Sequence, residues 1–140
     1  TALRALAGDA GSLQFLPYGS IGEKERADKG KGNSANCPLP DQWGAMSVFD
    51  ALIYNTGRSP RSILYSLDNW QLLLVRHDRA FAAREGRPRH LKSRELNLTT
   101  AWKDALTALT DEVLADQFSD VLDQKRLRTL GARRNELLGL

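Results

Sequence analysis

The residues best suited to chemistry lie in one stretch, residues 48–81, where basic and polar side chains interrupt apolar runs. Arginine guanidinium groups can bind a phosphate directly through paired hydrogen bonds, in place of a metal ion. For Arg76, the alternative is that its side chain simply faces solvent. Six residues of the stretch are our candidates for binding a phosphate or a partner: Asn55, Arg58, Arg61, Arg76, His77 and Arg79.

Metal-dependent and nucleophilic chemistry have little support in the sequence. His77 and His90 are far apart in the chain and have no clear ligand partners, which disfavours a zinc site. Neither histidine lies in a recognisable hydrolase arrangement, and Cys37 lies in a stretch predicted to be flexible. Asp78 is the one candidate for a metal ligand, but pairing with Arg76 or Arg79 is its favoured role. The sequence therefore predicts no metal site.

Composition predicts a single modest domain. The chain has 140 residues, of which 41% are hydrophobic and 26% charged, as in ordinary globular proteins. Residues 58–94 contain nine Lys or Arg and only three Asp or Glu, although the whole chain carries a net charge of only +3. Such a local excess favours an anionic ligand or an acidic protein surface, and its alternative is a solvated loop. Aromatic residues are sparse there, so nucleic acid is only weakly indicated.

No membrane span is predicted, because the longest strongly apolar run, residues 72–75, is far shorter than the roughly 20 residues that cross a bilayer. The first ten residues lack the basic start and long apolar region of a signal peptide. One cysteine cannot form an internal disulfide, which favours a reducing compartment. We therefore expect a cytoplasmic protein.

The first part of the chain is expected to hold little regular structure. Residues 1–40 are predicted to form a flexible N-terminal segment, with a short helix at residues 2–7 and a short strand at 13–16. Residues 19–40 are rich in Gly, Lys, Asp, Asn and Pro, which lack the apolar content needed to pack. The run at residues 30–34 does not have the spacing of a phosphate-binding loop.

The middle of the chain predicts a helix followed by a β-hairpin. The helix begins near Asp41 and ends by Gly57, before Pro60. Two β-rich runs, residues 63–67 and 70–75, flank a turn at Asp68 and Asn69. Residues 82–97 are predicted to be irregular and basic. The apolar face of the helix comprises Met46, Phe49, Leu52 and Ile53.

The last third predicts three helices. Thr99 or Thr100 caps the first, Thr110 caps the second, and the third covers about residues 123–138. Their apolar faces comprise Leu98, Trp102, Ala105, Leu106, Leu109, Leu114, Phe118, Val121, Leu122, Leu127, Leu130, Leu137 and Leu138. Four arginines of the last helix are expected to lie mostly outside: Arg126, Arg128, Arg133 and Arg134.

This order of elements resembles the C-lobe of atypical bacterial kinases related to phosphatidylinositol kinases, secretory-pathway kinases and Hip-type toxin kinases. That family has a Val-Phe-Asp-x-Leu-Ile-x-Asn-x-Asp-Arg motif, an Asn-Ile-Leu motif, a hairpin, and an Ile-Asp-His-x-x-Ala-Phe motif. Residues 23–26 and the paired arginines of residues 130–138 are also similar to the family. The matching residues are Val48, Phe49, Asp50, Leu52, Ile53, Asn55, Arg58, Ile63, Leu64, His77, Ala80 and Phe81.

Three positions depart from the motifs of this family. The resemblance implies a catalytic Asp, a metal-binding Asn and a metal-binding Asp, where this chain has Gly57, Ser62 and Arg76. Gly57 has no carboxylate, and Ser62 is a neutral, weak ligand. A positive charge about 4 Å from a divalent cation would cost several kcal/mol, so Arg76 opposes metal binding. The implied catalytic set is therefore degenerate.

The sequence thus predicts a mainly α domain with a small central β-hairpin, resembling a kinase C-lobe over residues 41–140. The preferred function is a degenerate kinase-like binding or regulatory module that uses a basic loop face and needs no cofactor. One alternative is an active atypical kinase that uses ATP and Mg²⁺ with Asp78 or Asp50 as the displaced carboxylate. Another is a structural helical domain without a ligand. Residues 1–40 are too short for a kinase N-lobe, so we expect a C-lobe alone or a fragment.

Overall fold

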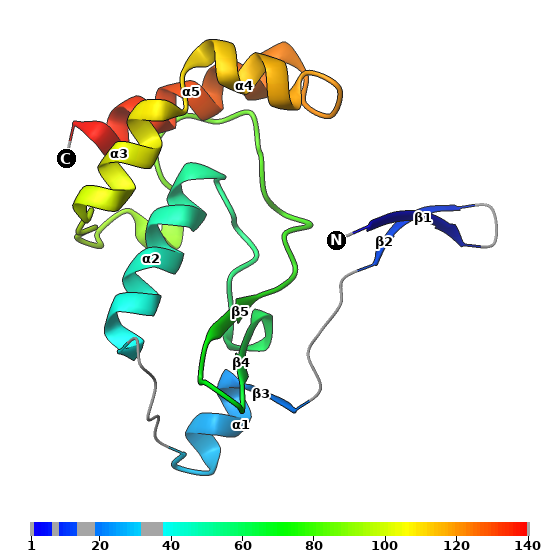
Figure 1. Cartoon of the computed structure of the whole chain (residues 1–140), viewed down its shortest axis with the longest axis vertical. Coiled ribbons are helices and arrows are strands. Elements are labelled where there is room, and N and C mark those ends of the chain that lie inside the picture. Colours follow the sequence, from blue (N-terminus) through cyan, green and yellow to red (C-terminus); the bar gives the residue numbers. More distant parts are fainter. Residues whose placement is uncertain (1, 7–8, 14–18, 32–37, 140) are drawn as a thin grey trace.

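A computed structural model of the chain describes residues 2–6, 9–13, 19–31 and 38–139 (Figure 1). The fold is mainly helical with a small antiparallel sheet, as predicted. Helices α3, α4 and α5 gather at one end, the small sheet and α1 lie at the other, and α2 extends between them (Figure 1). The elements are β1 (Ala2–Leu6), β2 (Asp9–Leu13), β3 (Ser20–Gly22), α1 (Glu23–Asp28), α2 (Leu39–Leu52), η1 (Pro60–Ser62), β4 (Ile63–Ser66), β5 (Leu72–Leu74), η2 (Arg89–Leu91), α3 (Thr100–Ala108), α4 (Asp111–Phe118) and α5 (Gln124–Leu138).

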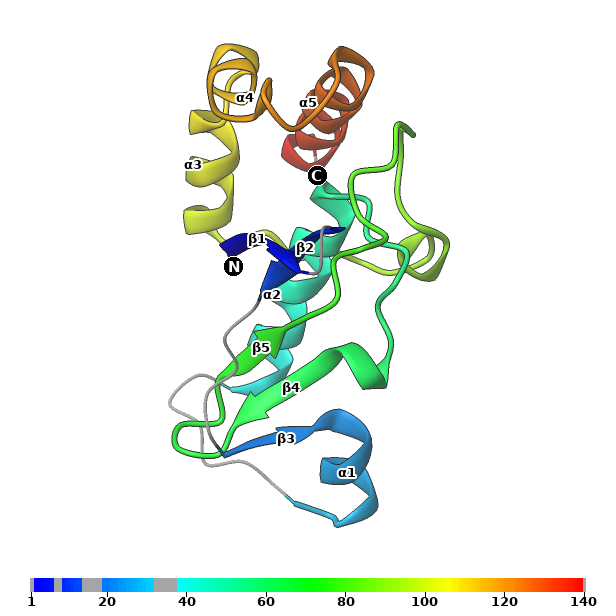
Figure 2. The same ribbon diagram turned by 90° about the vertical axis from the view of Figure 1, so that its right-hand side faces the viewer.

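The sheet contains β3, β4 and β5 in that order, and every pair is antiparallel. The β4–β5 hairpin confirms the predicted strand pair, with Ile63 opposite Leu74 and Tyr65 opposite Leu72. β3 adds a strand that the sequence does not predict, and it places Ile21 opposite Tyr65. Figure 2 shows α1 beside β3 at the outer edge of this sheet. The sheet is therefore completed by a segment from well before α2.

The expectation of little regular structure before Pro40 is wrong for β3 and α1. Three residues are too few to show the alternation that marks a strand, and α1 has no buried residue. Tertiary contacts hold both elements, because Ile21 is 3% exposed in the core and the guanidinium of Arg26 lies over the ring of Tyr65, 5.8 Å from its centroid. These contacts cannot be read from local sequence.

The first residues also differ from the prediction. β1 covers the residues predicted to form a helix, and it pairs with β2 in a separate two-stranded hairpin. Of the strand predicted at residues 13–16, only Leu13 is described, and it is the last residue of β2. Residues 14–16 lie outside the described residues.

Helix α2 is buried on most of its sides, because it contributes to two hydrophobic clusters. The sequence predicts a single apolar face, yet Ser47, Val48 and Asp50 are buried as well. The first cluster lies among α2 and the C-terminal helices, and its buried members are Val48, Ala51, Leu52, Leu91, Leu96, Leu106, Leu114, Leu130 and Leu137. The second lies between α2 and the sheet, and its buried members are Ile21, Met46, Ile63 and Tyr65.

The predicted caps of the C-terminal helices are confirmed. The hydroxyl of Thr99 accepts a hydrogen bond from the backbone amide of Trp102, and the hydroxyl of Thr110 accepts one from the amide of Val113. The cap of α5 is not predicted from the sequence: the Asp123 carboxylate accepts a hydrogen bond from the amide of Arg126 (2.8 Å). Each cap satisfies one of the amides that a helix start leaves unpaired. Across the described residues, none of these helices is long and apolar enough to cross a membrane.

Two arginines of α5 are buried, whereas the sequence predicts them outside. Arg133 is 2% exposed and donates to the carbonyls of Leu52 (2.6 Å), Ala82 (3.3 Å) and Arg84 (2.5 Å). Arg134 is 8% exposed and donates to the carbonyl of Leu109 (2.5 Å) at the end of α3. The last carbonyls of a helix have no partner within the helix, so a charged donor from elsewhere stabilises them. Both arginines therefore close the ends of neighbouring helices.

Substituting Arg133→Ala should lower the free energy of unfolding by on the order of 3 kcal/mol. The substitution removes three donors from buried carbonyls and leaves a cavity. Urea titration measures this change, with Arg128→Ala as the control on the exposed side of the same helix. The control should stay within about 0.5 kcal/mol of the unaltered chain. Equal effects of the two substitutions would contradict the role given to Arg133.

Candidate functional site

A cleft of about 320 Å³ lies where the loop after α2 meets the turn after β5. Two backbone hydrogen bonds join these segments: the amide of Thr56 donates to the carbonyl of Arg79 (3.2 Å), and the amide of Phe81 donates to that of Ile53 (2.6 Å). Segments distant in the sequence thus form the two walls of one site. The residues that line this arginine cleft are Thr56, Gly57, Arg58, Ser59, Arg61, Arg76, Asp78 and Arg79.

The structure brings three of the six predicted binding residues together at the surface of the cleft. Arg61, Arg76 and Arg79 are exposed and line it. Arg58 also lines the cleft, but its side chain is only 5% exposed. Asn55 is fully buried and His77 is half-buried, and both lie outside the lining. The exposed arginines are therefore the groups that can meet a ligand, and the other predicted residues lie behind them.

Arg58 forms a buried ion pair with Asp50, which is 1% exposed. Its Nε donates to Oδ2 of Asp50 (2.7 Å) and one Nη donates to Oδ1 (2.8 Å), which is the paired geometry that suits a guanidinium and a carboxylate. The other Nη donates to the carbonyls of Ser62 (2.8 Å) and Val75 (3.2 Å). Arg58 therefore connects α2, the end of η1 and the end of β5. We call Asp50, Asn55, Arg58 and His77 the Asp50 network.

Asn55 links the same carboxylate to the cleft wall. Its Nδ2 donates to Oδ1 of Asp50 (3.0 Å), and its Oδ1 accepts from the amide of Gly57 (2.9 Å). The Ser62 hydroxyl is bonded to the backbone of Ser59. Its Oγ accepts from the amide of Ser59 (2.9 Å) and donates to the carbonyl of Ser59 (2.9 Å). Both side chains are buried, bonded within the protein and absent from the cleft lining, so neither is available as a ligand.

His77 lies between the Asp50 network and an aromatic ring. Its Nε2 is 3.3 Å from an Nη of Arg58, and its ring meets that of Phe49 edge-on, with centroids 5.8 Å apart. A guanidinium can only donate, so Nε2 must accept and the imidazole is neutral. Burial, and then the positive charge of Arg58, lower the pKa of His77 from its ordinary 6.5. His77 therefore positions Arg58 and carries no charge to the cleft at neutral pH.

The turn that carries Arg76 has an unusual backbone. Arg76 has φ +61°, and Phe81 at the end of the same turn has φ +58°. A residue with a side chain rarely adopts this left-handed conformation, and it persists only where the surroundings determine it. The hydrogen bonds from Phe81 and from Arg58 to this segment supply that determination. They hold Arg76 at the mouth of the cleft.

Carboxylates suited to a metal ion are scarce at the cleft. Asp78 lines it beside the arginines, whereas the Asp50 carboxylate is fully engaged by Arg58 and Asn55. No group of three His, Cys, Asp or Glu that could hold a metal ion is found among the described residues. Three exposed arginines against one aspartate leave the cleft with a positive excess. Its composition suits an anion better than a cation.

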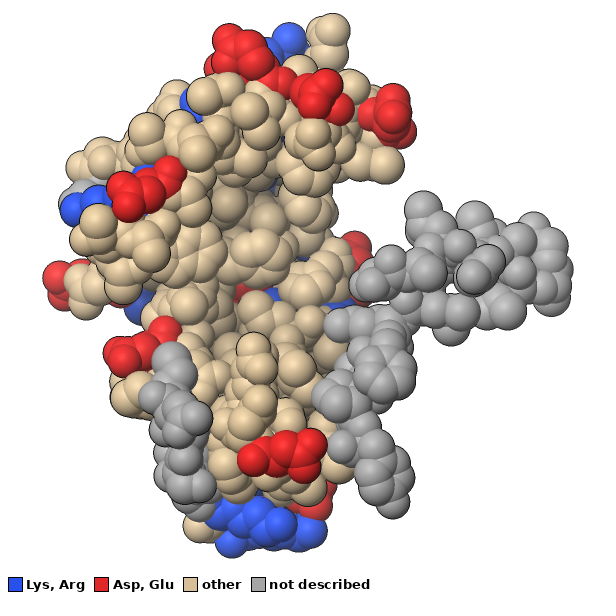
Figure 3. Space-filling view, viewed as in Figure 1, with Lys and Arg blue, Asp and Glu red and all other residues tan. Residues whose placement is uncertain are grey.

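The basic face predicted over residues 58–94 is narrower in the structure. Arg58 is internal, and Arg87 lies 3.3 Å from a carboxylate oxygen of Glu136. The arginine cleft is the part in which several basic side chains gather around one hollow. On the face seen in Figure 3, acidic side chains gather over α4 and basic ones over α1, and further acidic side chains lie along the left edge of the view. Charge is thus distributed unevenly.

Two residues of the cleft wall are missing from the sequence prediction. Thr56 and Ser59 line the cleft between the arginines. Their signal is weak, because a Thr or Ser beside Gly57 or Pro60 is also ordinary turn chemistry. Asp50 has another role than the displaced carboxylate that the sequence analysis names for the active-kinase alternative. The signal for its structural role is a carboxylate within a predicted apolar helix, which calls for a buried partner.

The chain was compared with protein-family models, with curated proteins and with solved structures, and none of them matches it. A function for the arginine cleft must therefore be argued from its own residues.

Substituting Asp50→Asn should lower the free energy of unfolding by on the order of 3 kcal/mol, because it leaves the buried guanidinium of Arg58 without its charge partner. Chemical denaturation measures this change. Asp104→Asn on the exposed surface of α3 is the matched control and should change stability by less than about 0.5 kcal/mol. If the two variants are equally stable, the ion pair does not hold the loop.

Stability should also fall as the pH is lowered through about 6.5. Burial lowers the pKa of His77 in the folded chain, and partial loss of hydration lowers that of His90, although His90 is an exposed residue. Both titrate near 6.5 when unfolded. Between the lowered pKa and 6.5 the unfolded chain binds more protons, so the free energy of unfolding decreases with acidification. Denaturation from about pH 7.5 to about pH 5 measures the slope. His77→Gln should flatten it in part and the His77→Gln, His90→Gln double variant further. An unchanged slope in the double variant would rule the histidines out.

Proposed function

We propose that this chain is a kinase-like C-lobe that no longer transfers a phosphoryl group and instead binds a phosphate-bearing ligand in the arginine cleft. The single observation that carries the proposal is the gathering of Arg61, Arg76 and Arg79 around one hollow of about 320 Å³. The cleft lies at the place where the kinase resemblance puts the catalytic centre. The proposal makes the module a binding or regulatory unit.

The retained residues support the kinase-like part of the proposal. Asp50, Asn55 and Arg58 match the motifs of the family, and they form one buried network that joins helix, loop and hairpin. The order of a buried helix, an irregular loop, a hairpin and a tight turn also agrees with the expected C-lobe. This network supports the walls of the cleft from behind, and the choice of ligand is left to the exposed side chains.

The replaced residues support the loss of phosphoryl transfer. Gly57 supplies no carboxylate to orient an acceptor hydroxyl, and the Ser62 hydroxyl is engaged by Ser59. Arg76 brings a positive charge to the position where the metal ion would need a negative one. An active kinase would need Asp50 or Asp78 as its carboxylate, and both are poorly placed for this. Asp50 is buried against Arg58, and Asp78 lies among the arginines that line the cleft.

Guanidinium groups can replace a metal ion in holding a phosphate without catalysing its transfer. Each arginine offers several N–H donors in a fixed plane that matches phosphate oxygens, and its charge does not titrate near neutral pH. Like charges in one cleft repel each other, and a bound dianion would relieve this repulsion. The expected ligand is a phosphate monoester or a nucleotide phosphate, bound without Mg²⁺.

Binding of ATP in the presence of EDTA tests this proposal, with inorganic phosphate as a second ligand. A ligand at about 100 times its dissociation constant should raise the free energy of unfolding by roughly 2.7 kcal/mol. Arg76→Ala and Arg79→Ala should each weaken binding about tenfold, since each removes a charged hydrogen bond. Arg128→Ala on α5 is the matched control and should bind normally.

Two outcomes would contradict the proposal. No stabilisation by either ligand would show that the cleft binds no phosphate. Stabilisation only with Mg²⁺, accompanied by phosphate release, would favour the active kinase.

A further inference from the structure

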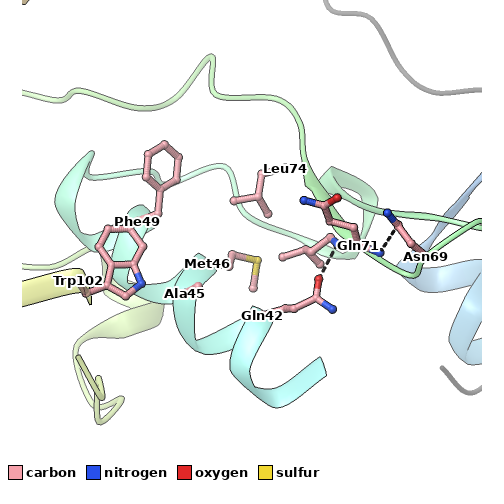
Figure 4. A pocket seen from close by; sticks show the side chains of 9 residues that line it. Gln42, Ala45, Met46, Phe49, Asn69, Gln71, Leu74 and Trp102 are labelled. Carbon is pink, nitrogen blue, oxygen red and sulfur yellow. Dashed lines mark hydrogen bonds between the residues drawn. The ribbon is translucent and has the colours of Figure 1, made fainter. Parts of the chain in front are cut away.

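A second and larger hollow, of about 590 Å³, lies between α2 and β5 and is bounded by α3 (Figure 4). Four of its lining residues follow one face of α2 at helical spacing, and the others come from the hairpin and from α3. Among the residues that the structure describes, it shares none of its lining with the arginine cleft. The residues of this α2–β5 pocket are Gln42, Ala45, Met46, Phe49, Asn69, Gln71, Leu72, Leu74 and Trp102.

The pocket exists because two hydrophobic clusters meet along α2 without filling the space between them. Leu72 and Leu74 pack against the sheet cluster, and Trp102 packs against the helical cluster. All three remain only half-buried, whereas Met46 at the base of the pocket is 5% exposed. Protein interiors are normally packed to crystal-like density, so an apolar hollow of this size beside two hydrophobic clusters is unusual.

The described lining of the pocket is uncharged. None of the nine described residues that line it is Asp, Glu, Lys or Arg, although 26% of the chain is charged. Figure 4 shows the aromatic rings of Phe49 and Trp102 at one end, and the side chains of Asn69 and Gln71 at the other. A charged ligand would lose its hydration here without gaining a counter-charge. The occupant must therefore be neutral, with an apolar body and one polar end.

The carboxamides define where the polar end lies. Gln42 is fixed, because its Nε2 donates to the carbonyl of Trp70 (3.2 Å) and its Oε1 accepts from the amide of Leu72 (2.6 Å). Asn69 uses its Oδ1 to accept from the amide of Gln71 (3.0 Å), so its amino group is the part that can donate to a ligand. A carbonyl or amide on the ligand would suit this end.

The same contacts argue against an added peptide strand. The amide of Leu72 points away from β4 and is already bound to Gln42, so this donor of β5 is not offered to another chain. Figure 4 shows side chains of the hairpin at one end of the pocket and the rings of Phe49 and Trp102, from α2 and α3, at the other. A small molecule fits these limits better than an extended segment.

We propose that the α2–β5 pocket is a binding site for a small, neutral, flat aromatic molecule with a carbonyl or carboxamide at one end. Its aromatic body lies between Phe49, Met46 and Trp102, and its polar end faces Asn69 and Gln71. The site is independent of the arginine cleft, since the two differ in lining and in ligand charge.

Met46 provides a direct measurement, because it is the only methionine in the chain and it lines the pocket. A ¹³C-methyl label on Met46 gives one NMR resonance, which is followed during titration with naphthalene-1-carboxamide. Naphthalene-1-carboxylate, which has the same rings and a negative charge, is the matched ligand. The carboxamide should shift the resonance saturably, and the carboxylate should bind at least about tenfold more weakly. No saturable shift, or equal affinity for the two ligands, would overturn the proposal.

Two variants locate the binding. Ala45→Trp should fill the pocket and abolish the response to the carboxamide, whereas Ala101→Trp, on the exposed surface of α3, should leave it intact. Loss of binding in both variants would contradict the location. The comparison of ligands uses the unaltered chain, so it stands even if Ala45→Trp does not fold. A Met46 shift that depends on protein concentration without ligand would identify a second copy as the occupant and overturn the proposal.

Discussion

The buried ion pair between Asp50 and Arg58 is the interaction on which the central part of this structure depends. Removing two charges from water costs several kcal/mol for each ion, and the attraction between them repays this only when the remaining donors are satisfied. Arg58 meets that condition, because its donors reach the carboxylate of Asp50 and the carbonyls of Ser62 and Val75. The pair adds little net stability over an apolar pair of the same volume. Its effect is to specify one arrangement: the loop after α2, the start of the hairpin and the turn after it must all meet at Arg58.

A similar use of arginine stabilises the helical end of the molecule. Arg133 and Arg134 extend from α5 to the last carbonyls of α2 and α3, so the relative positions of three helices are set by charged donors as well as by leucine packing. Between this end and the sheet, α2 belongs to two clusters that do not merge. The α2–β5 pocket is a consequence of that division. A helix held at both ends by polar contacts cannot move sideways to fill the space at its middle.

The sequence predicts the parts of this fold whose signals are local. Helix caps at Thr99 and Thr110 and the turn of the hairpin each depend on residues a few positions apart, and each is confirmed. The apolar periodicity of the last helices is confirmed for their leucines, whereas Val121 is 69% exposed. The parts missed depend on distant partners. β3 is only three residues long and exists because β4 offers an edge. Arg133 looks like a solvated residue until its partners in α2 and in residues 82–84 are known. At the candidate site, Asn55 and Arg58 were assigned to a ligand because residue type does not reveal that Asp50 is the group they serve.

Residues that face the arginine cleft and residues of the Asp50 network behind it have different effects on stability, and this difference bears on how the chemistry of the cleft could change. Gly57 and Arg76 face the cleft, and exchanging their side chains would alter its charge without breaking a buried contact. A Cβ at position 57 would lie 3.4 Å from Asn55 and from Arg79, which calls for only a small adjustment. In contrast, losing Asp50, Asn55 or Arg58 would leave buried polar groups without partners. Under the proposed kinase-like origin, substitutions at the first kind of position can convert an acidic, metal-binding site into a basic one at little cost in stability. The second kind has to be retained for the loops to keep their places, whatever the cleft binds.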